Sequence, residues 1–310
     1  MTALDAGTPR SAAAPGAAPT VEAPSGKGRG EENFPVGSWL IRRDLRVHVH
    51  AFYRFARNAD DIADNPALAA DDKLRRLDRM AAILDGVSES TPGGTPASNL
   101  SGESPAASAM RESLAATGVT PQHCHDVLHA FRQDAVKGRY RDWDDLMEYC
   151  RYSAAPVGRQ LLDLHGESRA TWPASDALCA ALQVLNHLQD CAADYRALDR
   201  VYLPLADLDA AGGGVEALAA PAASPGLRRV LDTLLDRTEM LIATARGLPP
   251  GVSARGLRWE SAVIVGLAAR LARRLRRGDP LASRVALTKS DCAAAFLIGI
   301  LARHRPHHQR

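Results

Sequence analysis

The feature that most constrains this chain is an acidic motif, Asp-x-x-x-Asp, that occurs twice in separate helical patterns. Asp60 and Asp64 form the first copy, and Asp190 and Asp194 form the second. Residues four apart lie on one face of an α-helix, about 40° out of alignment. Two such carboxylates repel each other by about a few tenths of a kcal/mol when exposed. We therefore expect a cation to bind beside each pair.

The residue types of the two motifs favour magnesium. Mg²⁺ takes one or two carboxylates, keeps several waters and completes its shell with substrate phosphate oxygens. Two acidic motifs on facing helices therefore predict Mg²⁺ that bridges the protein to a diphosphate, and Arg57 adds a cation one turn before Asp60. The alternative is a pair of solvated acidic helix faces. Phe55, Ile62 and Leu188 make both segments look half-buried, which favours the site.

The apolar spacing along the chain is typical of an all-α protein. No stretch shows the alternation of a β-strand. Helices are expected over 42–64, 71–84, 121–137, 143–166, 175–195, 227–246, 253–276 and 288–303. Pro156 predicts a kink inside one of them. Beside it, Ala154, Val157 and Gly158 either form the wall of a ligand cavity or allow close packing against another helix.

Composition divides the chain into one domain with two tails. Residues 1–30 are rich in Ala, Pro and Gly and are expected to be disordered. Residues 31–303 form a single helical domain, interrupted at about 86–108 by a Ser/Gly/Pro-rich mobile insert. Residues 304–310 form a basic tail. This tail is either solvated or in contact with anionic lipid, which leaves peripheral membrane association open.

Charge, cysteine content and hydropathy exclude several classes. A net charge of +2 argues against a dedicated nucleic-acid binder. Five cysteines without a Cys-x-x-Cys spacing indicate reduced thiols and a cytoplasmic protein. The N-terminal region lacks the apolar run of a signal peptide. No run reaches the roughly 18 apolar residues that cross a bilayer.

Five runs of sequence, taken together, carry a family resemblance. They are Glu32 to Trp39, Phe52 to Asp64, Asp142 to Gly158, Asn186 to Asp194 and Asp199 to Pro204. In these runs the chain resembles the squalene/phytoene synthases, head-to-head prenyl transferases. The resemblance implies a single-domain isoprenoid synthase fold, with helices around a central cavity. Within the family the chain most resembles the hydroxysqualene synthase branch (HpnC) of hopanoid biosynthesis.

The resemblance also implies site residues. The metal ligands would be Asp60, Asp61, Asp64, Asn186, Asp190 and Asp194. The substrate-binding residues would be Asn33, Phe34, Tyr53, Arg57, Gln183, Arg200 and Tyr202. No residue is assigned as the catalytic base. Asp199 stands where many phytoene synthases have glycine.

The implied reaction is the conversion of presqualene diphosphate to hydroxysqualene. Several Mg²⁺ ions would assist ionisation of the diphosphate, the carbocation would rearrange, and water would capture it without NADPH. Partners would be the prenyl diphosphate and other enzymes of the hopanoid pathway. One alternative is head-to-head condensation of farnesyl diphosphate to presqualene diphosphate, squalene or phytoene. Another is a non-catalytic helical lipid-binding or assembly protein, in which the acidic motifs should be broken.

Overall fold

The computed structural model describes residues 21–22, 41–87, 103–288, 290–292 and 295. The helices among them are α1 (Arg46–Asp64), α2 (Ala70–Leu84), α3 (Pro105–Thr117), α4 (Gln122–Val136), α5 (Trp143–Ser153), α6 (Ala155–Leu164), α7 (Trp172–Leu198), α8 (Leu205–Ala210), α9 (Pro225–Ala245), α10 (Leu248–Gly251) and α11 (Arg255–Arg277). Where both partners are described, extended pairing is limited to one isolated bridge, from Arg139 to Val201. The prediction of an all-α fold is confirmed.

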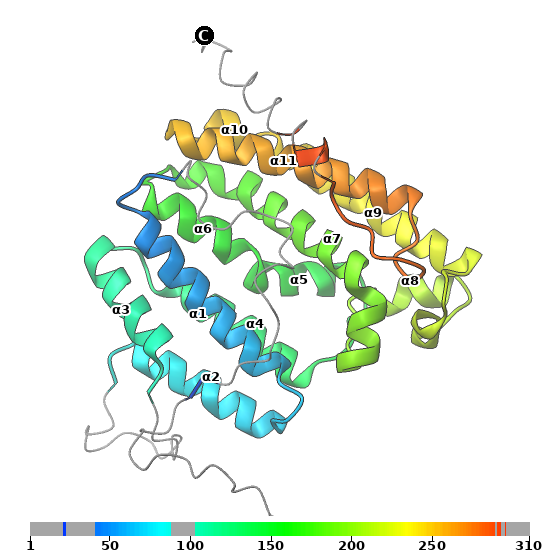
Figure 1. Cartoon of the computed structure of the whole chain (residues 1–310), viewed down its shortest axis with the longest axis horizontal. Coiled ribbons are helices and arrows are strands. Elements are labelled where there is room, and N and C mark those ends of the chain that lie inside the picture. Colours follow the sequence, from blue (N-terminus) through cyan, green and yellow to red (C-terminus); the bar gives the residue numbers. More distant parts are fainter. Residues whose placement is uncertain (1–20, 23–40, 88–102, 289, 293–294, 296–310) are drawn as a thin grey trace, which may run out of the picture.

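The helices form successive layers (Figure 1). Helices α2 and α3 lie at one edge and pack on α1 and α4. Helices α5 and α6 pack between α4 and α7, and α9 and α11 cover the other side of α7. Helix α7 carries the second acidic motif, so this motif lies in the middle of the stack and the first lies on α1.

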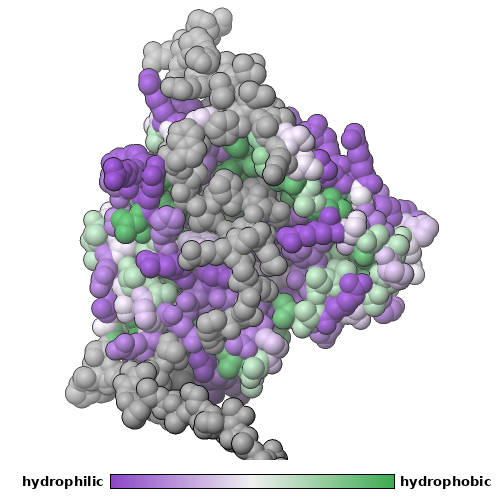
Figure 2. Space-filling view, viewed as in Figure 1, coloured by the Kyte–Doolittle hydropathy of each residue, from purple (hydrophilic) through white to green (hydrophobic). Residues whose placement is uncertain are grey.

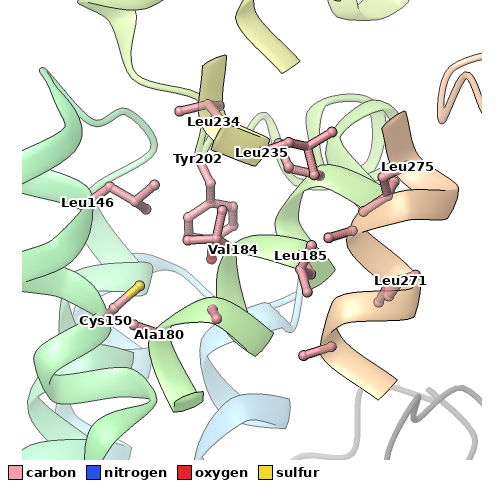
Figure 3. Close-up of a cluster of buried hydrophobic side chains, with 14 of the residues drawn as sticks. Leu146, Cys150, Ala180, Val184, Leu185, Tyr202, Leu234, Leu235, Leu271 and Leu275 are labelled. Carbon is pink, nitrogen blue, oxygen red and sulfur yellow. The ribbon is translucent and has the colours of Figure 1, made fainter. Parts of the chain in front are cut away.

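The larger core surrounds α7. Figure 3 shows Leu185 of α7 near Leu235 of α9 and Leu271 of α11, and Val184 of α7 beside Tyr202. Leu185 and Leu271 are fully buried. Burying a leucine side chain contributes about 1.5–3 kcal/mol, so this apolar face holds α7 firmly against α9 and α11.

The smaller core explains why Asp60 and Asp61 face away from the packed side of α1. Phe55, Ala59 and Ile62 of α1 are fully buried against α2, α3 and α4. Tyr53 and Arg57 lie on the other side of α1 and are half-buried. The 3.6-residue period of the helix therefore separates a packed apolar face from a polar face that carries the motif.

The predicted kink at Pro156 is confirmed. Helix α5 ends at Ser153 and α6 begins at Ala155, with Ala154 at φ −114° and ψ −49° between them. A Cβ atom on Gly158 would lie 2.3 Å from Ser175 Oγ of α7. At Gly158 the structure therefore shows close helix packing, the second of the two alternatives. Val157 is 47% exposed and stays a candidate for a cavity wall.

The predicted mobile insert at 86–108 was wrong at its C-terminal end. Helix α3 begins at Pro105, and the Ser104 side chain accepts a hydrogen bond from Ala107 N at 3.2 Å. Serine as an N-cap followed by proline in the first turn is a normal helix start. Residues 88–102 lie outside the described residues.

The predicted disorder of residues 1–30 was wrong for the two of them that the structure describes. Val21 is buried in the core beside α1 and α2, and its amide donates to Glu103 O at 3.1 Å. The Glu22 carboxylate accepts a hydrogen bond from Ala106 N at 2.9 Å, at the start of α3. The rest of 1–30, most of the predicted helix 288–303 and the basic tail 304–310 lie outside the described residues.

Hydrophilic side chains predominate over the face in Figure 2, with smaller hydrophobic areas between them. Among the described helices, none combines the length and the apolar character that a membrane span requires.

Candidate active site

The polar face of α1 carries two accessible carboxylates and a cation. Arg57 Nη1 lies 3.3 Å from Asp60 Oδ2, and Arg57 Nη2 lies 3.2 Å from Asp61 Oδ1. The Asp60 and Asp61 side chains are 32% and 17% exposed. Tyr53 is half-buried one turn earlier. Both carboxylates can therefore receive a ligand from the solvent side of the helix.

The third aspartate of the motif is held differently. Asp64 is buried, and its Oδ1 accepts a hydrogen bond from Arg200 Nη1 at 2.8 Å. Arg200 comes two residues after the end of α7. Because this ion pair joins the C-terminal ends of α1 and α7, both acidic motifs lie towards the same end of the helical stack.

The turn that aims Arg200 at Asp64 is made by Asp199. This residue ends α7 in the left-handed region, at φ 47°. Glycine adopts that conformation without steric cost, and aspartate is one of the few other residues that tolerates it. Arg139 donates to the backbone carbonyl and to the carboxylate of Asp199. The structure thus accounts for an aspartate where many phytoene synthases have glycine.

The second acidic motif lies on a single face of α7. Asn186, Asp190 and Asp194 follow one another at intervals of four residues, and all three are half-buried. No three His, Cys, Asp or Glu side chains converge as a metal centre in the described part of the chain. The oxygen donors fit Mg²⁺, which keeps waters and shares substrate phosphates, better than a metal held by protein ligands alone.

The two acidic motifs together form the rim of the candidate site. A buried carboxylate that the sequence analysis did not identify, Asp134, lies behind this rim. Asp134 of α4 accepts hydrogen bonds from Tyr149 OH at 2.7 Å and from Tyr202 OH at 3.1 Å. Arg200 Nη2 donates to the Asp134 backbone carbonyl at 3.0 Å. Burial raises the pKa of Asp134 to about 6, and the charge of Arg200 opposes that rise. Asp134 therefore gathers two phenols and a guanidinium at one buried point.

One signal in the sequence could have identified Asp134. It follows Val127 by seven residues, and Val127 and Ala130 occupy the buried face of the same helix. A carboxylate at a position of the apolar stripe must be hydrogen-bonded or paired, because burying a lone charge is costly.

Tyr202 and Gln183, both predicted to bind substrate, contact the same histidine. The His187 ring stacks on Tyr202 with centroids 3.4 Å apart and an angle of 13° between the rings. His187 Nε2 lies 3.2 Å from Gln183 Nε2. Figure 3 shows Tyr202 next to Val184 in the core. Tyr202 is therefore placed behind the rim, whereas Gln183 is half-buried.

Burial lowers the pKa of His187 to about 3, and the charge of Arg200 adds to the effect. Its imidazole is therefore neutral at physiological pH. An unfolded chain binds a proton at histidine near pH 6.5, whereas folded His187 does so only near pH 3. The unfolding free energy should consequently fall as the pH drops from 6.5 towards 3, by up to about 1.4 kcal/mol per pH unit.

The variant His187→Leu should lack this pH dependence of stability. Between pH 6.5 and 5.0 the free energy of unfolding of the wild type should fall by about 2 kcal/mol more than that of the variant. Urea unfolding of both proteins across this range measures the difference. Parallel pH curves for the two proteins would contradict the buried neutral histidine.

Two predicted residues lie outside the described part of the chain, and one pocket has a lining that the predicted site residues do not share. Asn33 and Phe34 are outside the described residues. A pocket of about 230 Å³ is lined by Gly212, Gly213 and Gly214 and by the start of α9. None of the predicted site residues lines this pocket.

Known proteins resemble the chain over most of its length. The family model described as squalene/phytoene synthase matches residues 28–291. A hydroxysqualene synthase of Rhodopseudomonas palustris is 48% identical over 263 residues, which is 85% of this chain and 86% of that protein. A hydroxysqualene synthase of Sinorhizobium fredii is 45% identical, over 83% of this chain and 84% of that protein.

A crystal structure of squalene synthase HpnC from Alicyclobacillus acidocaldarius is also similar. It superposes with a TM-score of 0.67 at 31% identity, and the match covers 80% of this chain and 89% of that one. The likeness therefore extends from the sequence to the arrangement of the helices.

Proposed function

The chain belongs to the squalene/phytoene synthase family, and we propose that it is a hydroxysqualene synthase that acts on presqualene diphosphate. The observation that carries the proposal is the identity of 45% and 48% to two hydroxysqualene synthases. These matches span more than four fifths of both chains. The range that the family model matches, residues 28–291, contains both acidic motifs, which a non-catalytic protein would not need.

The residues of the rim suit the first chemical step. The diphosphate leaves the cyclopropylcarbinyl carbon of presqualene diphosphate only if its developing negative charge is stabilised in a site of low dielectric. Bound Mg²⁺ would supply that stabilisation as a Lewis acid. We assign its binding to Asp60, Asp61 and Asp64 on α1 and to Asn186, Asp190 and Asp194 on α7. Their oxygen donors and their location at one end of the stack support this assignment.

Arg57 has a separate part in this step. Its guanidinium already bridges Asp60 and Asp61, so it holds both carboxylates in one orientation. The same guanidinium can donate to a diphosphate oxygen, because it carries five N–H donors. We assign Arg57 and Tyr53, one turn apart on α1, to orientation of the diphosphate.

The cation that remains must be shielded until water captures it. Apolar side chains shield it without offering a nucleophile, and Val157 of α6 presents such a surface. The cyclopropylcarbinyl cation rearranges with opening of its three-membered ring, and capture of the rearranged cation by water forms the C–O bond of hydroxysqualene and releases one proton. Because this step transfers no hydride, it consumes no reduced nicotinamide.

Product analysis tests the proposal. Purified protein with Mg²⁺ and without NADPH is incubated separately with presqualene diphosphate and with farnesyl diphosphate, and the lipid extract is identified by mass spectrometry. Hydroxysqualene should form from presqualene diphosphate. Accumulation of presqualene diphosphate from farnesyl diphosphate would place the enzyme at the condensation step instead. Binding of both substrates without turnover would favour a non-catalytic protein.

A further inference from the structure

We propose that Arg200 passes from Asp64 to Asp134 when Asp64 takes up Mg²⁺, so that Asp134 is a positioning residue for metal loading. The inference rests on the proposed role of Asp64 as a metal ligand. It adds to that role a residue outside both acidic motifs and a movement of one side chain.

Arg200 competes with a metal for Asp64. Its Nη1 donates to Asp64 Oδ1 at 2.8 Å, and both side chains are buried. A second cation is close by, since Lys73 Nζ donates to the carbonyl of Ala63 at 2.7 Å. A divalent ion on Asp64 would face like charge from Arg200 at short range, where the low dielectric of a buried site strengthens repulsion. Metal binding at Asp64 therefore requires the guanidinium to withdraw.

Asp134 carries a second carboxylate beside Arg200 that can receive it. Asp134 Oδ1 lies 3.9 Å from Arg200 Nε, just beyond hydrogen-bond distance. Arg200 Nη2 is already anchored on the Asp134 backbone carbonyl at 3.0 Å. A small rotation about this anchor can bring Nε onto the carboxylate without moving the backbone.

The neighbours of Asp134 keep its carboxylate in place for this exchange. Tyr149 OH donates to Oδ2 and Tyr202 OH donates to Oδ1, from two different parts of the chain. A carboxylate oxygen can accept more than one hydrogen bond, so Oδ1 can bind Arg200 while it keeps Tyr202. Because two hydrogen bonds hold the Asp134 carboxylate in place, Arg200 is the side chain that moves. Its bond to the Asp134 carbonyl keeps the guanidinium close to that carboxylate during the movement.

Two measurements test the exchange without relying on activity. Crystals grown with Mg²⁺ and inorganic pyrophosphate should show Asp64 in a metal shell and Arg200 Nε within hydrogen-bond distance of Asp134 Oδ1. Calorimetry of Mg²⁺ binding in the presence of pyrophosphate should show affinity reduced about tenfold in Asp134→Asn, the lower end of the effect of removing an outer-shell partner. Asp126→Asn, on the same helix, should bind like the wild type.

The outcomes that overturn the proposal are distinct. Metal ions bound by Asp60 and Asp61 while Arg200 remains on Asp64 would exclude the exchange, and this crystallographic result does not depend on any variant folding. Wild-type Mg²⁺ affinity in folded Asp134→Asn would remove Asp134 from metal loading. If product analysis fails but Arg200 moves as described, the proposed reaction is wrong and the exchange stands.

Discussion

Asp60→Asn and Asp190→Asn should each lower turnover of presqualene diphosphate by about 10²-fold or more and leave the helical fold intact. Each change removes one charge from a carboxylate that we assign to metal binding. Removing one group that stabilises charge in a transition state typically costs about 10²–10³ in rate. The loss should therefore be far larger than an indirect effect on the fold would cause.

Stability should change little in Asp60→Asn. Asp60 is about a third exposed and pairs with Arg57 at 3.3 Å, and such surface ion pairs contribute about 0–1 kcal/mol. Loss of one carboxylate also relieves repulsion along the face of α1. Product formation, circular dichroism and thermal melting measure the two effects separately. Asp209→Asn, an exposed carboxylate of α8, is the matched control, and wild-type turnover in both motif variants would refute the metal assignment.

Local sequence predicted the helices that carry the motifs because the apolar spacing and the residues that end a helix agree with each other in these segments. In α1 the buried residues Phe55 and Ile62 recur at helical spacing, and Pro66 follows closely after the helix ends. The kink at Pro156 likewise follows from a missing amide hydrogen. These features depend on residues within one or two turns, and the sequence displays them directly.

The first turn of α3 was predicted to be part of a loop, although its start carries a recognisable signal. Its residues are rich in alanine and serine, so its apolar stripe is weak and composition suggested a loop. Ser104 followed by Pro105 marked the start of the helix. This N-cap pattern is a stronger indication of a helix start than the composition of the preceding residues is of a loop.

The buried cluster behind the rim depends on contacts that no local pattern contains. Arg200 bonds Asp64 across 136 positions and the Asp134 carbonyl across 66. The family resemblance implied that Arg200 and Tyr202 bind substrate, and the structure places both against Asp134. Which buried carboxylate receives which donor is decided by the packing of α1, α4 and α7, and therefore becomes visible only in three dimensions.

Arg200→Met should lower the free energy of unfolding by about 3–5 kcal/mol, the cost of removing one partner from a buried ion pair. Asp64 would lose its 2.8 Å salt bridge, and Asp134 would lose the donor to its backbone carbonyl. Methionine keeps most of the side-chain volume, so a cavity should contribute little. Chemical denaturation at pH 8 measures the loss. Adding Asp134→Asn should restore part of it, because one of the two buried charges is then removed.

The size and the pH dependence of the stability loss distinguish Arg200→Met, which breaks a buried ion pair, from a variant that breaks an exposed arginine ion pair. Arg276 also has acidic partners, Asp236 at 2.7 Å, Glu239 at 3.1 Å and Asp232 at 3.8 Å, but its side chain is 34% exposed. Arg276→Met should therefore cost less than about 1 kcal/mol.

The stability loss of Arg200→Met should also depend on pH. Burial already raises the pKa of Asp134 to about 6, and the charge of Arg200 opposes that rise, so loss of Arg200 must raise the pKa of Asp134 further. A carboxyl with a raised folded-state pKa destabilises the fold above that pKa and ceases to do so once protonated. The deficit of Arg200→Met should consequently shrink between pH 8 and pH 5, and equal, pH-independent losses in both arginine variants would show that burial of the cluster is not the cause.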